Sequence, residues 1–244
     1  MSQPIVRIEA IITSVDYSDF LLFSLPKNKK HFDAITVLTA PRDKFTQETC
    51  KYYGVDYITT SSFFRNGAPF NKGQAMNIGV ANSHYQDWIL FLDGDIVLPD
   101  NFRESLLAYG LNYDYLYGVN RFKVVERSKF KKIDERCPGI KGDLFYLRNN
   151  PVPPEYPLLP NCTLPGEGYP LPIGFFQLFH YSRLRQHNRK YPEVYPTAGL
   201  SDLYFAAQWE EQNRLLIPDA AVMHLQTKDL APADNWAGRT TEKF

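Results

Sequence analysis

Apolar, β-branched runs alternate with helix-like segments along the first part of the chain, and this alternation limits the possible folds most strongly. The predicted elements are strands over 6–14, 34–39 and 55–59, with helices over 20–25 and 44–53 between them. Asp16, Ser18 and Asp19 are candidate N-caps for the first helix, and Gly54 is a candidate C-cap for the second. Strands that alternate with helices are typical of a parallel sheet covered by helices.

The alternation continues to residue 125 and resumes at residue 174. It predicts helices over 74–83, 102–109 and 204–212, and strands over 88–92, 116–125, 174–179, 215–217 and 220–224. Between these parts, residues 151–172 hold eight of the 18 prolines, which fit neither a central strand nor a helix interior. We therefore expect a single α/β domain over residues 1–244, with a mostly parallel, Rossmann-like sheet and an irregular proline-rich insertion.

Charge and composition exclude several classes of protein. The chain has 27 basic and 27 acidic residues, and a net charge of zero argues against a protein that coats nucleic acid or an anionic membrane. The sequence has no run of about 18 apolar residues that would predict a transmembrane segment, and no basic start before an apolar run that would predict a signal peptide. Three scattered cysteines suit a reducing compartment. We expect a cytoplasmic protein that does not bind nucleic acid.

The segment Trp88-Ile-Leu-Phe-Leu-Asp93-Gly94-Asp95 carries the strongest chemical signal. A buried strand delivers two carboxylates at its carboxyl end, which is the edge where open α/β sheets bind ligands. Side chains two residues apart leave a strand on the same face, so Asp93 and Asp95 can converge. Two converging carboxylates repel each other unless a cation neutralises them, and a divalent ion that carries a diphosphate is a natural partner. A plain Asp-Gly turn is the alternative.

This segment also resembles the first motif of haloacid-dehalogenase-type phosphatases, in which the first Asp is the nucleophile. Three predicted strand-helix units precede it here, whereas that family places it on the opening strand. The downstream sequence also has no Asp-Asp pair to complete that family's metal site. A nucleotidyltransferase is a further alternative, but the first strand is not followed by a glycine-rich basic loop. A third is a module that binds a nucleotide sugar or glycan without turnover.

Five segments in order resemble motifs of glycosyltransferases with the GT-A fold, family 2 and galactosyltransferase-like members. Asp93-Gly94-Asp95 looks like their Asp-x-Asp motif. The other four are Asn71 to Gly79, Leu200-Ser201-Asp202, Val222-Met223-His224-Leu225, and Asn235-Trp236-Ala237-Gly238-Arg239. In that order, the first is similar to a Lys-x-x-Ala-x-Asn-x-Gly stretch, and the second is similar to a Glu-Asp pair with Ser in place of Glu. The third is similar to a segment that supplies a metal-binding His, and the fourth is similar to a closing motif. The resemblance spans residues 8 to 240.

The resemblance implies a metal-dependent enzyme that moves a hexose from a nucleotide-diphosphate sugar, with a UDP-sugar favoured, to a glycan or other hydroxyl acceptor, with inversion. It places the metal, Mn²⁺ or Mg²⁺, on Asp95 and His224, with Asp93 on the ribose or on a metal-bound water. Imidazole beside carboxylate oxygen suits Mn²⁺ better than Ca²⁺. A buried, hydrogen-bonded histidine is the alternative for His224.

The donor-binding part would lie within about 1–120 and the acceptor side within about 121–224. The residues implied for the nucleotide-sugar donor are Thr13, Ser14, Asp16, Tyr17, Arg42, Lys72 and Asn77. Lys72 would meet the phosphates or the sugar, and its alternative is a solvated surface lysine. Helix capping is the alternative for Asp16. On the acceptor side, the excursion over 121–172 carries a local basic excess, and Tyr146, Tyr156 and Tyr169 could stack on sugar rings or simply fill a scaffold.

Asp202 is the predicted catalytic base, because an inverting transfer needs one carboxylate beside the acceptor hydroxyl. Its alternative is a cap for a helix that begins near Leu203. Residues 225–244 show little periodicity and are predicted to form a lid. In that lid Lys228 and Arg239 would meet phosphate, and Trp236 would exclude water. A frayed terminus is the alternative for the lid.

Overall fold

The computed structural model describes residues 6–124, 143–154, 156, 158–159, 170–226, 235 and 237–239. The strands are β1 (Ile8–Thr13), β2 (Ala34–Thr39), β3 (Asp56–Thr59), β4 (Trp88–Asp93), β5 (Ile96–Val97), β6 (Leu116–Val124), β7 (Leu158–Leu159), β8 (Phe176–His180) and β9 (Arg214–Leu225). The α-helices are α1 (Ser18–Asn28), α2 (Lys44–Tyr53), α3 (Lys72–Ala81), α4 (Phe102–Tyr109), α7 (Tyr181–Gln186) and α8 (Ser201–Ala206). The 3-10 helices are η1 (Lys29–His31), η2 (Ser62–Gly67), η3 (Tyr146–Arg148) and η4 (Glu211–Asn213).

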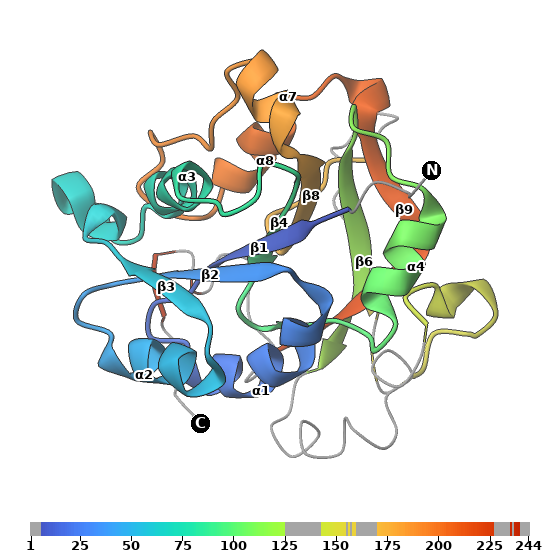
Figure 1. Cartoon of the computed structure of the whole chain (residues 1–244), viewed down its shortest axis with the longest axis horizontal. Coiled ribbons are helices and arrows are strands. Elements are labelled where there is room, and N and C mark those ends of the chain that lie inside the picture. Colours follow the sequence, from blue (N-terminus) through green and yellow to red (C-terminus); the bar gives the residue numbers. More distant parts are fainter. Residues whose placement is uncertain are drawn as a thin grey trace.

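The described strands form one sheet in the order β3-β2-β1-β4-β8-β6-β9-β5, with β7 paired to β6 (Figure 1). The first four strands are parallel, as the alternation of strands and helices predicts. Strand β8 then runs antiparallel to β4 and β6, while β6 and β9 are parallel over most of their length. The longer pairings are therefore mostly parallel, and the predicted α/β fold class is confirmed.

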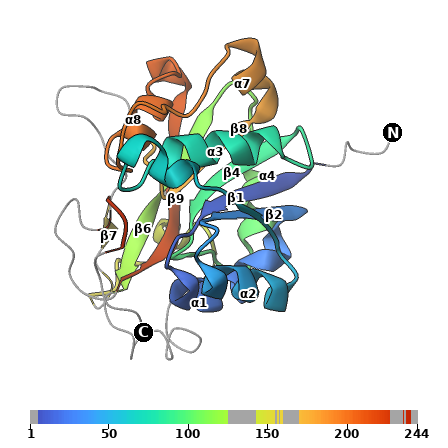
Figure 2. The same ribbon diagram turned by 90° about the vertical axis from the view of Figure 1, so that its left-hand side faces the viewer.

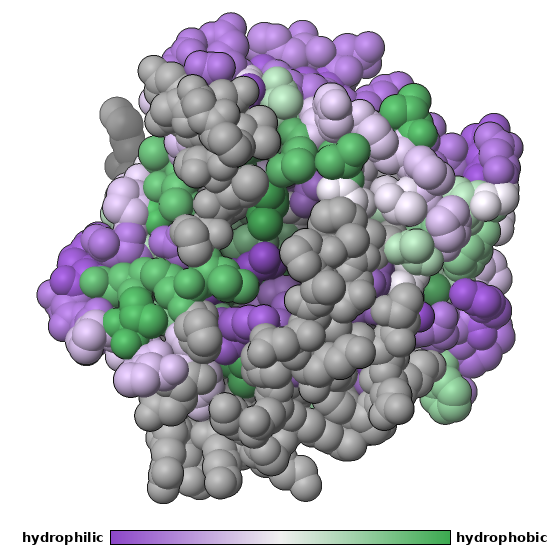
Figure 3. All heavy atoms as spheres, turned by 180° about the vertical axis from the view of Figure 1, so that it is seen from behind, coloured by the Kyte–Doolittle hydropathy of each residue, from purple (hydrophilic) through white to green (hydrophobic). Residues whose placement is uncertain are grey.

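Helices cover both faces of the sheet (Figures 1 and 2). One hydrophobic cluster joins α1, α2 and α4 to one face through Leu21, Cys50 and Phe102. A second cluster joins α3, α7 and α8 to the other face through Met76, Leu184 and Phe205. In Figure 2, α3, α7 and α8 accordingly lie above the strands, and α1 and α2 lie below them. The surface seen from behind carries hydrophobic areas among hydrophilic ones (Figure 3).

Several predicted boundaries agree with the structure and others are wrong. The elements β2, α2 and α4 match residue for residue, and Gly54 ends α2 in the left-handed conformation with φ 62°. The strands predicted over 215–217 and 220–224 are one strand, β9. Pro218-Asp219 reads as a break in the sequence. The strand instead continues through it, with Asp219 at φ 59° and an irregular register opposite Gly118 and Asn120.

Two helices differ from expectation at their ends. The helix predicted over 204–212 is α8, which begins at Ser201 and ends at Ala206, because Arg214 takes the carbonyl oxygens of Ala207 and Trp209 at its end. Helix α1 begins without a side-chain cap. Asp16 instead lies in a left-handed turn with φ 63°, and its N–H donates to Asp43. The helix α7 was not predicted.

Much of the predicted insertion lies outside the described residues, namely 125–142, 155, 157 and 160–169. Most of the predicted lid does as well, including Lys228 and Trp236. Where the chain is described, it has no helix that combines the length and apolar character needed to cross a membrane.

Candidate active site

A cleft of about 630 Å³ opens at the carboxyl ends of β1 and β4. These strands are paired in parallel with Thr13 opposite Asp93, so their last residues face the same opening. Of the predicted site residues, the cleft is lined by Thr13, Tyr17, Lys72, Asp93, Asp95, Asp202, His224 and Arg239. These residues come from both halves of the chain, and the fold therefore brings most of the predicted site together.

Lys72 is the buried counterion of Asp93. It is the first residue of α3, whose N-cap Asn71 accepts a hydrogen bond from the Gln74 N–H at 3.0 Å. Lys72 is 7% exposed, and its Nζ lies 2.6 Å from Asp93 Oδ1. Burial is the largest single effect and opposes the charged ammonium, but Asp93, together with Asp202 and Asp95, holds the pKa of Lys72 above its ordinary value. The interpretation of Lys72 as a surface lysine is therefore wrong.

Helix α3 can approach this position only because its second residue is a glycine. A Cβ on Gly73 would lie 2.0 Å from the carbonyl oxygen of Pro192. Asn71 adds a second link to the same segment, because its side-chain amide donates to the Glu193 carbonyl at 2.8 Å. Close backbone contact with residues 192–193 therefore positions the start of α3, and with it Lys72, beside the cleft.

Asp95 and His224 face each other across the short β5–β9 pairing. Ile96 is paired with His224, and the Leu225 N–H donates to the Asp95 carbonyl at 2.9 Å. His224 Nε2 lies 3.3 Å from Asp95 Oδ2, and the Gln226 amide nitrogen lies 3.4 Å from His224 Nδ1. Burial alone would raise the pKa of Asp95, but His224 and, more weakly, Arg121 hold it below the ordinary value.

This pair fits part of the coordination shell of a divalent cation. Asp95 Oδ1 is buried and has no hydrogen-bond partner, so an oxygen is available for a metal. Imidazole nitrogen with carboxylate oxygen is a suitable donor set for Mn²⁺. Within the described ranges no group of three His, Cys, Asp or Glu side chains could hold a metal ion, and Asp93 is engaged by Lys72. Asp95 and His224 would therefore supply two ligands, and the remaining ones would come from a bound substrate or water.

Asp202 lies in the first turn of α8, on the wall of the same cleft. Its Oδ2 accepts the Gly174 N–H at 2.7 Å, and its Oδ1 accepts the Leu203 N–H at 2.8 Å. Gly174 is required there, because a Cβ would lie 2.8 Å from the Asp202 Cβ. Burial raises the pKa of Asp202, and Lys72 and the two N–H donors offset only part of this effect. The result is a fixed carboxylate with enhanced basicity.

Some residues at and after the end of β1 line the cleft, and others form contacts that support the fold. Thr13 and Tyr17 line the cleft, while Ser14 is buried and its N–H donates to Leu38. Asp16 does not line the cleft, and Arg42 lies 3.5 Å from its carboxylate. Burial and the nearby Asp95 raise the pKa of the Tyr17 phenol, so this group stays protonated as a hydrogen-bond donor.

Arg239 joins the C-terminal segment to the beginning of α1. Its Nη2 lies 2.7 Å from Asp19 Oδ2, and its Nη1 donates to the Asp16 carbonyl at 2.9 Å. The guanidinium carbon also lies 4.9 Å from the centre of the Tyr17 ring. The planar fork that was predicted to meet phosphate is therefore occupied by Asp19, although Arg239 still lines the cleft.

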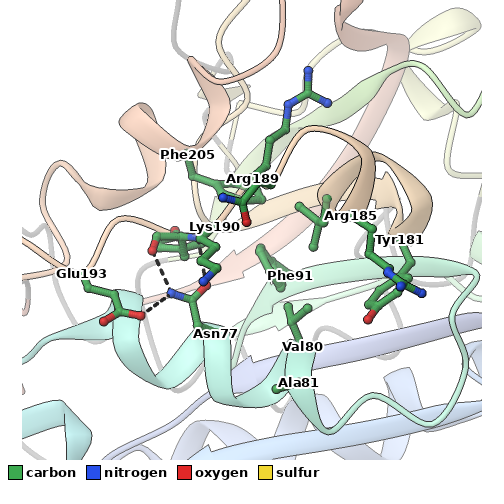
Figure 4. A pocket seen from close by; sticks show the side chains of 13 residues that line it. Asn77, Val80, Ala81, Phe91, Tyr181, Arg185, Arg189, Lys190, Glu193 and Phe205 are labelled. Carbon is green, nitrogen blue, oxygen red and sulfur yellow. Dashed lines mark hydrogen bonds between the residues drawn. The ribbon is translucent and has the colours of Figure 1, made fainter.

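Asn77 is not brought into the cleft. Its amide donates to the Tyr191 carbonyl at 2.9 Å and to Glu193 Oε1 at 2.8 Å (Figure 4). Its Oδ1 accepts the Tyr191 N–H at 2.9 Å. The side chain thus fastens residues 191–193 to α3 and borders a separate pocket of about 290 Å³. All these bonds serve the scaffold, so the structure does not bring Asn77 together with the other predicted site residues.

The tyrosines predicted to stack on sugars have different surroundings. Tyr156 is 9% exposed and belongs to a hydrophobic cluster with Phe122 and Met223. Tyr146 packs edge-to-face on Phe122, with the ring centres 5.8 Å apart. The scaffold interpretation therefore holds for Tyr156, and Tyr169 lies outside the described residues.

Arg121 is a cleft residue that sequence reasoning missed. It lies on β6, lines the cleft, and its guanidinium stacks 4.5 Å above the Phe175 ring. Burial lowers its pKa, while Asp95, Asp93 and Asp202 act in the opposite direction. In the sequence Arg121 appears only as the first residue of the basic stretch 121–136. No local pattern distinguishes it from the other basic residues of that stretch.

Comparisons with known proteins support the fold. No family model matches the sequence, and no curated protein matches it. Glucosyl-3-phosphoglycerate synthase from Mycobacterium tuberculosis, crystallised with Mn²⁺, uridine-diphosphate-glucose and phosphoglyceric acid, is similar in structure. Its TM-score is 0.54, with 12% identity over 90% of this chain and 71% of that chain. A mycobacterial protein has a TM-score of 0.50, with 12% identity over 90% and 67%. At these identities the likeness concerns the fold alone, and the chain has the GT-A fold seen in glycosyltransferases.

Proposed function

We propose that the protein is a metal-dependent glycosyltransferase that moves a sugar from a nucleotide-diphosphate sugar to a hydroxyl acceptor, with inversion. The observation that carries this proposal is the arrangement of two kinds of carboxylate in one cleft. Asp95 and His224 form an incomplete metal-binding pair, with one buried carboxylate oxygen free of partners. Asp202 is held in the same cleft by two backbone N–H groups. A metal-bound donor and a base are the two parts that such a transfer needs.

On the donor side, Asp95 and His224 would hold Mn²⁺ or Mg²⁺, and the ion would neutralise the charge that grows on the departing diphosphate. Lys72 fixes Asp93 close to the end of β4 and prevents two bare carboxylates from repelling each other. Asp93 also lines the cleft, and its second oxygen would accept a hydrogen bond from a ribose hydroxyl. Thr13 and Tyr17 form the neighbouring wall.

On the acceptor side, Asp202 would take the proton of the attacking hydroxyl. The hydroxyl oxygen forms the new bond to the anomeric carbon as the bond from that carbon to the diphosphate oxygen breaks. The Gly174 and Leu203 N–H groups keep the Asp202 carboxylate in one orientation, so it need not reorganise during transfer. Attack from the face opposite the leaving group inverts the configuration at carbon.

The choice of donor and metal has support from proteins that share the fold. The M. tuberculosis synthase was crystallised with Mn²⁺ and uridine-diphosphate-glucose, which is consistent with a UDP-sugar and Mn²⁺ for this chain. The acceptor proposed here is a glycan or other hydroxyl compound, and the sequence expectation of family 2 membership stays a prediction.

The direct test is to incubate the protein with UDP-, GDP- and dTDP-sugars, Mn²⁺ and a panel of hydroxyl acceptors. Release of nucleoside diphosphate together with a glycosylated product is the expected result. Release of inorganic phosphate from a phosphate monoester would instead indicate the phosphatase chemistry that the Asp93-Gly94-Asp95 segment also permits. Donor binding without turnover in any combination would indicate a binding module.

A further inference from the structure

Arg121 places a partly exposed positive charge in the cleft. Its Nε is fully buried and has no hydrogen-bond partner. Its guanidinium carbon lies 4.5 Å from the centre of the Phe175 ring. A guanidinium has five N–H donors, and leaving buried donors unsatisfied is costly. A protein retains such a group where a ligand supplies the missing acceptors.

The neighbouring carboxylates do not need Arg121 as a counterion. Asp93 is bound by Lys72, Asp95 faces His224, and Asp202 accepts two backbone N–H groups. Arg121 interacts electrostatically with all three, but it forms no hydrogen bond to any of them. Arg121 lines the same cleft as these three carboxylates.

The surroundings of Arg121 suit a planar, two-oxygen contact. Stacking on Phe175 holds the guanidinium plane in one orientation, and an arginine fork binds a phosphate or carboxylate through two parallel hydrogen bonds. Lys123 lies two residues further along β6 and lines the same cleft, as the strand periodicity requires. The two side chains place positive charge on one face of one strand.

We propose that Arg121, assisted by Lys123, is a substrate-anion subsite that binds a phosphate or carboxylate group within the cleft. This inference deepens the proposed function and rests on it for the identity of the substrate. Two sources present this chemistry there: the diphosphate of the donor, and an acidic group on the acceptor. Arg121 lines the same cleft as Asp95 and Asp202, so both sources are compatible with its position.

The experiment compares four full-length proteins by calorimetric titration at fixed ionic strength: wild type, Arg121→Gln, Arg121→Lys and Arg148→Gln. Arg148 is a matched control, because it also stacks on a phenylalanine, 4.5 Å above Phe145, but lies outside the cleft. One arm titrates UDP with Mn²⁺. The other titrates glycerol 3-phosphate into protein saturated with UDP and Mn²⁺, with glycerol as the uncharged comparison.

We expect Arg121→Gln to weaken one of the two titrations by at least about tenfold, the scale of a charge-assisted hydrogen bond. Arg121→Lys should lose part of that affinity, because it keeps the charge but not the fork. Loss in the UDP arm assigns the anion to the donor, and loss in the glycerol 3-phosphate arm assigns it to the acceptor. Binding of both probes unchanged within twofold would overturn the proposal.

Melting temperatures separate a binding role of Arg121 from a purely structural one. The probe whose titration Arg121→Gln weakens should raise the melting temperature of wild type and Arg148→Gln, and raise that of Arg121→Gln much less. If Arg121→Gln merely lowers the starting melting temperature and gains the same increment from each probe, Arg121 is structural and the subsite is wrong. Neither titration needs turnover, so an absence of glycosyl transfer would refute the proposed function without affecting this result.

Discussion

Asp95 and His224 define the smallest unit of the proposed chemistry. His224 Nε2 lies 3.3 Å from Asp95 Oδ2, and the other carboxylate oxygen, Asp95 Oδ1, has no hydrogen-bond partner. A histidine that was present only for packing would not leave a buried carboxylate oxygen unsatisfied beside it, since such an oxygen costs free energy. The pair therefore makes most sense as a site that a cation completes.

Replacing Asp95 should abolish metal-dependent donor binding, whereas replacing His224 should only weaken it. Asp95→Ala removes the anionic ligand, so Mn²⁺-dependent binding of UDP should be lost. His224→Ala should weaken binding by roughly 10- to 100-fold, as loss of a metal-supporting contact often does. Titration of UDP with Mn²⁺ and with EDTA measures both, and Asp100→Ala, an exposed carboxylate 53% accessible, is the control. Unchanged UDP affinity in EDTA would exclude the metal site.

Asp202 should control the chemical step rather than donor binding. Asp202→Asn keeps the size of the side chain but cannot accept a proton, so kcat should fall by at least about 10²-fold. UDP affinity should stay the same. Steady-state kinetics with donor and acceptor varied separately distinguish these effects. A variant with normal turnover per folded molecule would show that Asp202 only supports the helix.

The same residue sets the pH dependence. Burial is the main reason that the pKa of Asp202 is raised above its ordinary value. The base works when deprotonated, so kcat should rise with pH through this raised pKa and be lost below it. The acid limb should therefore lie at a higher pH than an ordinary aspartate would give. A profile that is flat down to the ordinary aspartate range would remove Asp202 as the base.

At the scale of elements, η1 contains a buried histidine with a measurable effect on stability. His31 is 2% exposed and packs edge-on to Phe102, with ring centres 5.5 Å apart. Burial and the adjacent Lys30 lower its pKa to about 4. The unfolded chain, with an ordinary histidine pKa near 6.5, binds the proton more tightly than the folded one. Stability should therefore fall as pH drops from about 6.5 to about 4.

The size of this effect follows from the pKa difference and is on the order of 3 kcal/mol across that range. Urea denaturation at a series of pH values measures it. His31→Leu removes the titrating group from an apolar site, so its stability should depend less on pH over the same interval. His84→Leu is the control, since His84 is exposed near Asp56. Equal pH slopes for wild type and His31→Leu would contradict the assignment.

The elements also show how far a sequence can predict this fold. The boundaries of β2, α2 and α4 depend on local apolar runs, caps and a C-terminal glycine, and the predictions for them are correct. Local patterns do not show that β6 pairs with β8 and β9, which follow it by more than 50 residues. This pairing is what carries Arg121 into the cleft, so neither its burial nor its role could be read from its neighbours in sequence.

The same limit applies to the motif residues. Lys72 and Asn77 occupy one helix and one sequence motif, and the resemblance treats both as donor-binding. Only Lys72 reaches the cleft, whereas Asn77 is turned toward residues 191–193. That segment lies more than 110 residues further along the chain, and nothing within α3 predicts its arrival. The sequence therefore predicts which side chains could take part in the site. Whether each side chain points into the cleft depends on packing against segments far away in the sequence.

At the scale of the whole molecule, Arg239 near the C-terminus lies against the start of α1. Arg239 is bound by Asp19 at the start of α1, and Asn235 and Gly238 line the cleft with it. Only 4% of the Arg239 side chain and 11% of the Asp19 side chain are exposed. A buried pair of this kind strongly resists loss of one partner, because the other charge is then left uncompensated. Asn235, Gly238 and Arg239 thus form part of the cleft wall, while the predicted lid over residues 225–244 stays a prediction.

Removal of residues 235–244 should therefore affect both stability and transfer, and the two effects can be separated. Truncation leaves Asp19 buried without its partner, so the free energy of unfolding should fall by about 3 kcal/mol or more. Adding Asp19→Asn removes the uncompensated charge and should recover most of that loss. It should not recover transfer, because Asn235, Gly238 and Arg239 are still absent from the cleft lining and water would enter there. The share of donor lost to hydrolysis should be raised equally in both truncated proteins, as measured by the ratio of nucleoside diphosphate to glycosylated product. Full recovery of that ratio by Asp19→Asn would show that the tail acts only through stability.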